Sequence, residues 1–325
     1  MKIVYMGTPD FAVGPLAALR DAGHEILAVV TQPDKEKGRG KEMQACAVKE
    51  YAITKGIPVF QPVRIKTAEA VESLKKYEAD IYIVAAFGQI LSKEILEIPK
   101  YGCLNIHASL LPKYRGAAPI QWSILMGEEQ SGVTIMQMDV GLDTGDMLLK
   151  EVVPIEKKET GQTLHDKLMA AGARLIVLSL AKIEAGTIQR EKQKDEESCY
   201  ASMLSKEMGR ILWEKEAVEI ERLIRGLNPW PSAYTYYQGK TLKIWEASVL
   251  EKSYLETFGE QEQMQLLDAI PGSIILCNKD SIYVATGKGI LCITSVQLEG
   301  KKKMSVHDFM LGKQFLPGQI LQNTK

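Results

Sequence analysis

An amide and an imidazole stand two residues apart at the end of a short apolar run in this chain. The run Cys103-Leu104-Asn105-Ile106-His107 has the length and composition of a buried β-strand. Side chains at i and i+2 of a strand project from one face, so Asn105 and His107 would enter the same space. A loop marked by Pro and Gly follows at once. A donor amide beside a titratable imidazole suits stabilisation of an oxyanion, so the pattern predicts acyl transfer.

An acidic turn offers a third chemical group. The turn Gly141-Leu142-Asp143-Thr144-Gly145-Asp146 follows a second apolar run. A carboxylate that glycines hold beside a strand could orient His107 or favour its charged form. Asp and Gly are also ordinary turn residues, and spacing does not choose between Asp143 and its neighbours Asp139 and Asp146.

Together the two blocks resemble the formyltransferases that use 10-formyltetrahydrofolate. The resemblance lies in Asn-x-His-x-Ser-Leu-Leu-Pro-x-Tyr-Arg-Gly, at 105–116, and in the later acidic turn. Within this family the match is closest to the members that formylate methionyl-initiator tRNA. It rests there on Gly-Thr-Pro-Asp-Phe at 7–11, Gly-Arg-Gly-Lys at 38–41 and Asn-Pro-Trp-Pro at 228–231. The likeness covers nearly the whole chain.

The resemblance implies that Asn105, His107 and Asp143 are catalytic, with Asp143 chosen because it falls on the family's Gly-x-Asp-Thr-Gly position. It implies 10-formyltetrahydrofolate as a cosubstrate that leaves as tetrahydrofolate, and methionyl-initiator tRNA as the acceptor in translation initiation. The segments expected to bind the folate consist of Phe87, Gly88, Gln89, Ile90, Leu91, Ser109, Leu110, Leu111, Pro112 and Asp139.

A basic loop offers a contact for the tRNA. Lys35-Glu36-Lys37-Gly38-Arg39-Gly40-Lys41 follows the second expected strand and would overhang the same rim as His107. Its four cations and two glycines could follow a phosphate backbone. The resemblance assigns Lys37, Arg39 and Lys41 to tRNA binding.

The first part of the chain alternates strands and helices. This order predicts a Rossmann-like α/β domain whose mainly parallel sheet is covered on both faces. Sites in such sheets lie beyond the carboxyl ends of the strands, where His107 would stand. Strands are expected at 3–6, 26–30, 58–60 and 81–86, and helices at 11–22, 45–55, 67–77 and 164–183.

A second domain follows a charge run at 190–198, which is the best linker candidate. Short strands separated by turn residues suggest a small β-barrel there, and the resemblance implies an OB-like one that contributes to tRNA binding. The lysines at 301–303 could face tRNA or form a solvated edge. The predicted division is a catalytic domain at 1–189, a linker at 190–207 and a C-terminal domain at 208–325.

Composition fits a two-domain globular protein of 325 residues, with 46% hydrophobic and 25% charged residues. A net charge of −1 leaves no global basic field for a polyanion. Five cysteines without a C-x-x-C pair indicate free thiols and no metal site. The sequence shows no export signal or membrane-spanning run, so we expect a cytoplasmic protein. We also expect a monomer.

Other functions fit the sequence less well. The motif G-x-G-x-x-G is absent after the first strand, which disfavours a nicotinamide enzyme. The same folate chemistry on a sugar-nucleotide amine is the main alternative, although that type does not usually carry Gly-Arg-Gly-Lys. The purine-pathway type usually lacks a second domain. A tRNA-binding module with a decayed active site would not need Asn105, His107 and Asp143 intact.

Overall fold

The computed structural model describes residues 1–37, 42–251, 253, 256, 259 and 268–324. The chain forms two compact units. The first comprises Met1–Ile120, Glu129–Ile155 and Leu164–Ser202, and the second comprises Gln121–Glu128, Glu156–Thr163 and Met203–Lys325. The predicted domain boundaries at 189 and 207 stay a prediction. The last change from one compact unit to the other falls between them, after Ser202.

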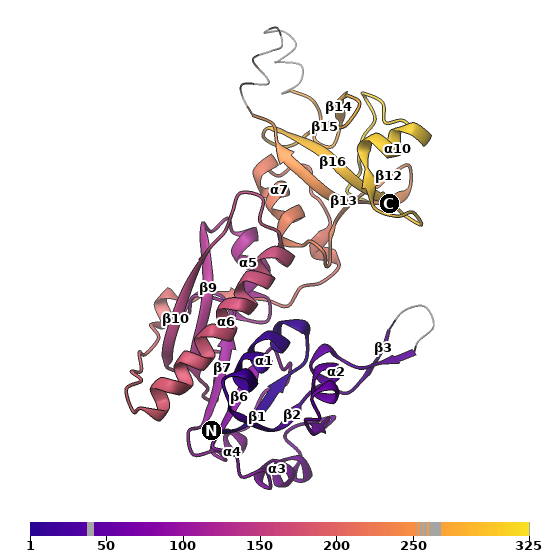
Figure 1. Cartoon of the computed structure of the whole chain (residues 1–325). Coiled ribbons are helices and arrows are strands. Elements are labelled where there is room, and N and C mark those ends of the chain that lie inside the picture. The colour runs from indigo at the N-terminus through magenta and orange to yellow at the C-terminus, as the bar shows by residue number, and fades with distance from the viewer. Residues whose placement is uncertain (38–41, 252, 254–255, 257–258, 260–267, 325) are drawn as a thin grey trace. The chain divides into compact units, whose positions relative to one another are not determined.

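A seven-stranded sheet forms the centre of the first unit, in the order β10-β9-β7-β6-β1-β2-β5 (Figure 1). The five neighbouring strands β7, β6, β1, β2 and β5 pair in parallel, whereas β9 pairs antiparallel with β7 and β10 pairs antiparallel with β9. The predicted mainly parallel sheet is therefore confirmed. The strands are β1 Lys2–Gly7, β2 Glu25–Val30, β5 Val59–Phe60, β6 Ile81–Ala85, β7 Cys103–His107, β9 Gln130–Gln137 and β10 Met147–Pro154.

Helices lie on both faces of this sheet, and the side chains of β7, which point alternately to the two faces, lie close to helices on each side. On one face, Cys103 belongs to a buried cluster that includes Leu74 of α3 and Ile95 of α4. On the other face, Ile106 lies close to Gly172 of α6. Asn105 and His107 share the face of Cys103. The helical elements of the first unit are η1 Asp10–Ala12, α1 Val13–Asp21, α2 Ala47–Thr54, α3 Ala68–Lys75, α4 Lys93–Leu96 and most of α6 Gly161–Glu184, while most of α5 Pro119–Leu125 belongs to the second unit.

Local sequence accounts for helix α3. Helix α3 begins after Thr67, whose hydroxyl accepts a hydrogen bond from the backbone N–H of Ala70 at 3.3 Å. The apolar face of α3 then buries Val71 and Leu74 at helical spacing. Helix α3 therefore covers the sheet face that carries Tyr82.

Three short strand pairs were not predicted. The polar segment after β2 contains β3 Lys35–Lys37 and β4 Glu42–Gln44, which pair antiparallel. Strands β8 Arg115–Gly116 and β11 Tyr200–Ala201 pair in parallel. Strand β17 Met304–Ser305 pairs with a longer strand of the second unit. Such pieces bury no alternating apolar face, so periodicity gives no signal for them.

The second unit is built on an antiparallel sheet in the order β12-β13-β16-β15-β14. Helix α7 Ala217–Gly226 begins with a capping box between Glu216 and Glu219 and buries Ile220 and Ile224 in the same cluster as the sheet. The further elements are η2 Asp195–Glu197 in the first unit and, in the second, η3 Glu207–Gly209, β12 Ala233–Tyr237, β13 Lys240–Val249, β14 Ile274–Cys277, β15 Ile282–Ala285, β16 Ile290–Leu298 and α10 Val306–Gly312.

The expected barrel is not closed by strand pairing within the described residues. The edge strands β12 and β14 do not pair with each other there. The C-terminal segment instead bonds to both edges, with Gln322 paired to Tyr236 and Gln319 accepting a bond from the backbone of Ile274. The antiparallel class of this domain is confirmed, and a closed barrel is not.

Candidate active site

The carboxyl end of β7 carries Asn105 and His107. The strand lies between β6 and β9, so its backbone is paired on both sides. His107 is buried, with only 6% of its side chain exposed. A central strand that is paired on both edges gives the two side chains a rigid support.

The carboxylate of Asp143 connects the two side chains. Its Oδ1 accepts a hydrogen bond from Nδ2 of Asn105 at 3.3 Å. Its Oδ2 accepts a second bond from the backbone N–H of Gly116 at 2.8 Å and lies 3.7 Å from Nδ1 of His107. The structure therefore brings together the three residues that the sequence predicted as catalytic, while their catalytic roles stay a prediction.

The other ring nitrogen of His107 has a fixed partner. Nε2 lies 2.9 Å from the backbone carbonyl oxygen of Tyr114. A carbonyl oxygen can only accept, so Nε2 carries a hydrogen and donates it. Nδ1 is then the nitrogen on the side of Asp143. In the neutral ring Nδ1 bears the lone pair, and in the charged ring it bears a second N–H.

The acidic turn holds Asp143 in a left-handed backbone conformation, with φ of 53°. Asp139 shapes the turn, because its Oδ1 accepts bonds from the N–H of Gly141 and the hydroxyl of Thr144 at 3.0 and 2.7 Å. Asp139 therefore caps the turn, and it is Asp143 that reaches Asn105. The hydrogen-bond partners therefore distinguish Asp143 from Asp139, which their positions in the sequence did not.

The segment after β6 carries half of the predicted folate site. Phe87 and Leu91 are buried in the cluster of Cys103, whereas Ile90 is 67% exposed. The side chain of Gln89 accepts from the N–H of Ile65 at 2.7 Å. Gly88 has φ of 81°, which suits a residue without a Cβ.

Four more of the predicted folate residues, at 109–112, follow soon after β7. The hydroxyl of Ser109 donates to the carbonyl oxygen of Lys113 at 2.7 Å, which closes the loop on itself. Leu111 packs in a small buried cluster with Met136 and Met147. Leu110 lies against Gly132 of β9. Pro112 is joined to Leu111 by a cis peptide bond.

One of the three predicted tRNA-binding residues lies in the strand pair of β3 and β4. Lys37 ends β3. Arg39 and Lys41 lie outside the described residues. The hairpin leaves the sheet after the carboxyl end of β2, the same edge that carries His107 at the end of β7.

Comparison with known proteins identifies the family. A model described as "Formyl transferase" matches residues 1–180, and one described as "Formyl transferase, C-terminal domain" matches residues 203–314. The chain belongs to the formyltransferase family. It is 55% identical over 312 residues to the methionyl-tRNA formyltransferase of Agathobacter rectalis, with 96% of each chain covered. It is 51% identical to the methionyl-tRNA formyltransferase of Clostridium tetani, with 99% of this chain and all of the relative covered.

Solved structures of other proteins share the fold. The N-formyltransferase of Helicobacter canadensis, in complex with folinic acid and dTDP-3-aminofucose, matches with a TM-score of 0.65 at 21% identity, covering 94% of this chain and all of that one. HypX of Aquifex aeolicus, in complex with tetrahydrofolic acid, matches with a TM-score of 0.63 at 18% identity. This chain covers only 47% of HypX, and 96% of this chain is matched.

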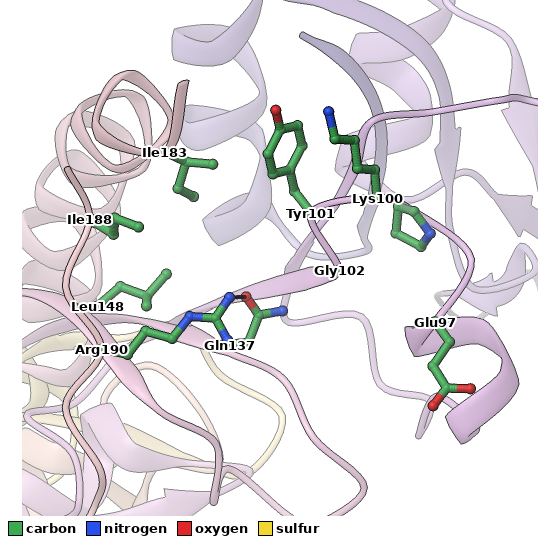
Figure 2. A pocket seen from close by; sticks show the side chains of 10 residues that line it. Glu97, Lys100, Tyr101, Gly102, Gln137, Leu148, Ile183, Ile188 and Arg190 are labelled. Carbon is green, nitrogen blue, oxygen red and sulfur yellow. Dashed lines mark hydrogen bonds between the residues drawn. The ribbon is translucent and has the colours of Figure 1, made fainter. Parts of the chain in front are cut away.

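A separate pocket of this formyltransferase lies at the amino end of β7, and it has a volume of about 520 Å³. Figure 2 shows Ile183 and Leu148 on one side and Tyr101 on the other. Arg190 donates to Oε1 of Gln137 at 3.5 Å at its base. The pocket opens before the start of the strand, so it is distinct from the catalytic candidates at the strand's other end.

In the part of the chain that the structure describes, no group of three or more His, Cys, Asp or Glu residues could hold a metal ion. None of the helices there has the length and apolar character to span a membrane.

Two contributors to the site were missed by reasoning from residue types. Both are backbone groups: the carbonyl of Tyr114, which receives the bond from His107, and the N–H of Gly116, which bonds Asp143. Both residues lie in the Tyr-Arg-Gly end of the motif at 105–116. The identity of a side chain gives no signal for what its backbone binds.

Proposed function

We infer that this protein transfers a formyl group from 10-formyltetrahydrofolate to the α-amino group of methionine esterified to initiator tRNA. The chemistry rests on one observation, the meeting of Asn105 and His107 with Asp143 at the end of a central strand. The choice of acceptor rests on the curated relatives, whose similarity extends over nearly the full chain.

The reaction proceeds by addition and elimination. The neutral amine of the methionyl ester attacks the formyl carbon, and the carbonyl oxygen becomes an oxyanion. The C–N10 bond then breaks, the former amine loses a proton, and N10 of the folate gains one. The products are formylmethionyl-tRNA and tetrahydrofolate.

In this proposal Asn105 stabilises the oxyanion. Its side-chain amide has two hydrogens, and one of them is used on Asp143. The second hydrogen donates to the developing oxyanion. The bond to Asp143 fixes the amide's orientation before the substrate arrives, which is the preorganisation that this kind of catalysis needs.

His107 supplies the proton transfers. Nε2 is occupied by the carbonyl of Tyr114, so Nδ1 is the nitrogen that exchanges a proton or donates to the oxyanion. The carboxylate of Asp143, at 3.7 Å, favours the charged ring that forms when Nδ1 takes a proton. We assign Asp143 this electrostatic role together with the positioning of Asn105.

We propose that the folate lies against the two segments at 87–91 and 109–112 and the turn at Asp139. Both segments leave parallel neighbouring strands, β6 and β7, at their carboxyl ends. Buried Phe87 and Leu111 give these segments apolar anchors, and their loop backbone offers the N–H and C=O groups that read a pterin edge.

We propose further that Lys37, Arg39 and Lys41 contact the acceptor arm of the tRNA. The support is their charge, their two interleaved glycines and the exit of the hairpin at the catalytic edge of the sheet. Charged initiator tRNA is a cytoplasmic substrate, so the cytoplasm is the proposed compartment.

The test supplies three acceptors with 10-formyltetrahydrofolate: methionyl-initiator tRNA, a sugar nucleotide with a free amine, and methionine alone. We expect formylation of the charged tRNA with release of one tetrahydrofolate per transfer. Formylation of the sugar nucleotide alone would show that the acceptor is a sugar-nucleotide amine and not methionyl-tRNA. Binding of the charged tRNA without any transfer would identify a binding module in place of an enzyme.

A further inference from the structure

One side chain from a charge-rich segment joins the two loops that complete the active site. The segment 190–198 was predicted to be a solvated linker, and its residues from Glu191 to Glu197 are exposed with one exception. The exception is Gln193, which is half-buried. This segment belongs to the same compact unit as the catalytic candidates.

Gln193 uses both ends of its amide. Nε2 donates to the carbonyl oxygens of Asp143 and Gly145, each at 2.8 Å. Oε1 accepts from Nε of Arg115 at 3.0 Å. The amide therefore has both donor hydrogens and an acceptor position engaged, an arrangement that only Asn or Gln can make with two carbonyls and one guanidinium.

The guanidinium of Arg115 ties the amide to the second loop. Its side chain is only 12% exposed, and its Nη2 also pairs with Asp195 at 2.8 Å. Arg115 stands between Tyr114, whose carbonyl receives the bond from His107, and Gly116, whose N–H bonds Asp143. Gln193 thus links the loop at 114–116 to the turn at 143–145.

The segment that carries Gln193 is itself fixed at two points. Glu191 exchanges two backbone hydrogen bonds with Met147 of β10, at 2.8 and 2.9 Å. Farther on, the carbonyl of Cys199 accepts from the N–H of Arg115 at 2.9 Å. Anchors on both sides hold the amide of Gln193 in place with little freedom to leave the turn.

We propose that Gln193 is a positioning residue for formyl transfer. Its amide holds the left-handed turn of Asp143 in position, so that the carboxylate stays bonded to Asn105 and Gly116 and close to His107. Gln193 touches no reacting atom, and it acts through Asp143. The expected effect on kcat rests on the proposed function. The expected effect on the turn of Asp143 rests on the hydrogen bonds alone.

The main variants are Gln193→Met, which removes all three hydrogen bonds at similar volume, and Gln193→Glu, which presents carboxylate oxygens to the two carbonyls. Lys192→Gln, an exposed neighbouring position, is the matched control. We expect both Gln193 variants to lower kcat about tenfold or more, with the KM for 10-formyltetrahydrofolate within about twofold of the unmodified protein. The scale follows from losing the two hydrogen bonds that hold the turn of Asp143.

A double-mutant cycle separates positioning from a general structural role. If Gln193 acts through Asp143, adding Gln193→Met to Asp143→Asn should slow the reaction little further. Multiplication of the two single effects, or a kcat of Gln193→Met within about twofold of the unmodified protein, would overturn the proposal.

Hydrogen exchange tests the same proposal without any substrate. Gln193→Met should speed exchange in peptides that cover 113–118 and 139–147, and Lys192→Gln should not. Unchanged exchange in these peptides would overturn the positioning role. Inactivity of the unmodified protein on methionyl-tRNA would instead overturn the proposed function, and it would leave the exchange result to decide the role of Gln193.

Discussion

Nδ1 of His107 lies 3.7 Å from Oδ2 of Asp143, while Nε2 of the same ring donates to a backbone carbonyl. The carboxylate therefore lies beside the ring without a short hydrogen bond to it. The same oxygen accepts the backbone N–H of Gly116, and its partner oxygen accepts Asn105. Asp143 acts as much on the loop and the amide as on the imidazole.

Asp143→Asn should slow formyl transfer by about 10- to 100-fold, because an amide has one acceptor oxygen where the carboxylate uses two. Steady-state rates of formyl transfer would measure the loss.

Asp146→Asn is the matched control, since Asp146 lies in the same turn and its carboxylate is not the one bonded to Asn105. It should stay close to the unmodified rate. A normal rate in Asp143→Asn, with a loss in Asp146→Asn, would move the catalytic assignment to Asp146.

Gly145→Ala should destabilise the first unit by about 1–3 kcal/mol, as overpacked sites do. A Cβ on Gly145 would lie 1.8 Å from the carbonyl oxygen of Gln137, so the turn must shift. Thermal unfolding would measure the loss. Leu142→Ala, at a 51% exposed position of the same turn, should change stability by no more than about 0.5 kcal/mol. Equal effects of the two changes would show that the turn is not tightly packed.

The strand-end site was predictable because its signals are local. The spacing of Asn105 and His107 places both on one face of β7, and periodic apolar runs predict the strands beside it. The choice of Asp143 over Asp139 depended on the resemblance, because their difference lies in which partner each carboxylate reaches. Gln193 gave no signal at all, since its three partners lie 48 or more residues away in the chain.

Cys103 should resist alkylation, although it stands two residues before Asn105. Burial raises the pKa of its thiol to about 12, so at pH 8 the thiol stays protonated as well as covered. Iodoacetamide treatment followed by peptide mass spectrometry should modify exposed Cys199 and spare Cys103. Rapid modification of Cys103 in the folded protein would contradict the packing of β7.

The same burial has a consequence for stability. The folded pKa of Cys103 lies above its ordinary value of 9.0, so its contribution is fully present below pH 9. That contribution should fall as the pH rises from about 9 towards 12, because the unfolded thiol ionises first. Chemical unfolding of Cys103→Ala and of the unmodified protein across this range would measure the difference in slope.

Arg39→Ala should weaken binding of methionyl-tRNA and reduce the salt dependence of its affinity, by up to about one unit of log–log slope for a lost phosphate contact. Folate binding should change little, since the folate is assigned to other segments. Arg20→Ala is the matched control: Arg20 lies near the end of α1, at the opposite edge of the sheet, and is 43% exposed. Equal salt slopes for the two variants would show that the cations of the loop are solvated and idle.

The most direct test of the account is the single-turnover rate of formyl transfer from 10-formyltetrahydrofolate to methionyl-initiator tRNA, measured by rapid quench for the unmodified protein, Asn105→Ala and His107→Ala. Loss of one oxyanion donor typically costs about 10²–10³ in rate. We predict a loss of this order in each variant, with folding and folate binding retained. A rate within a factor of about three of the unmodified protein in either variant would contradict the assignment of formyl transfer to the end of β7.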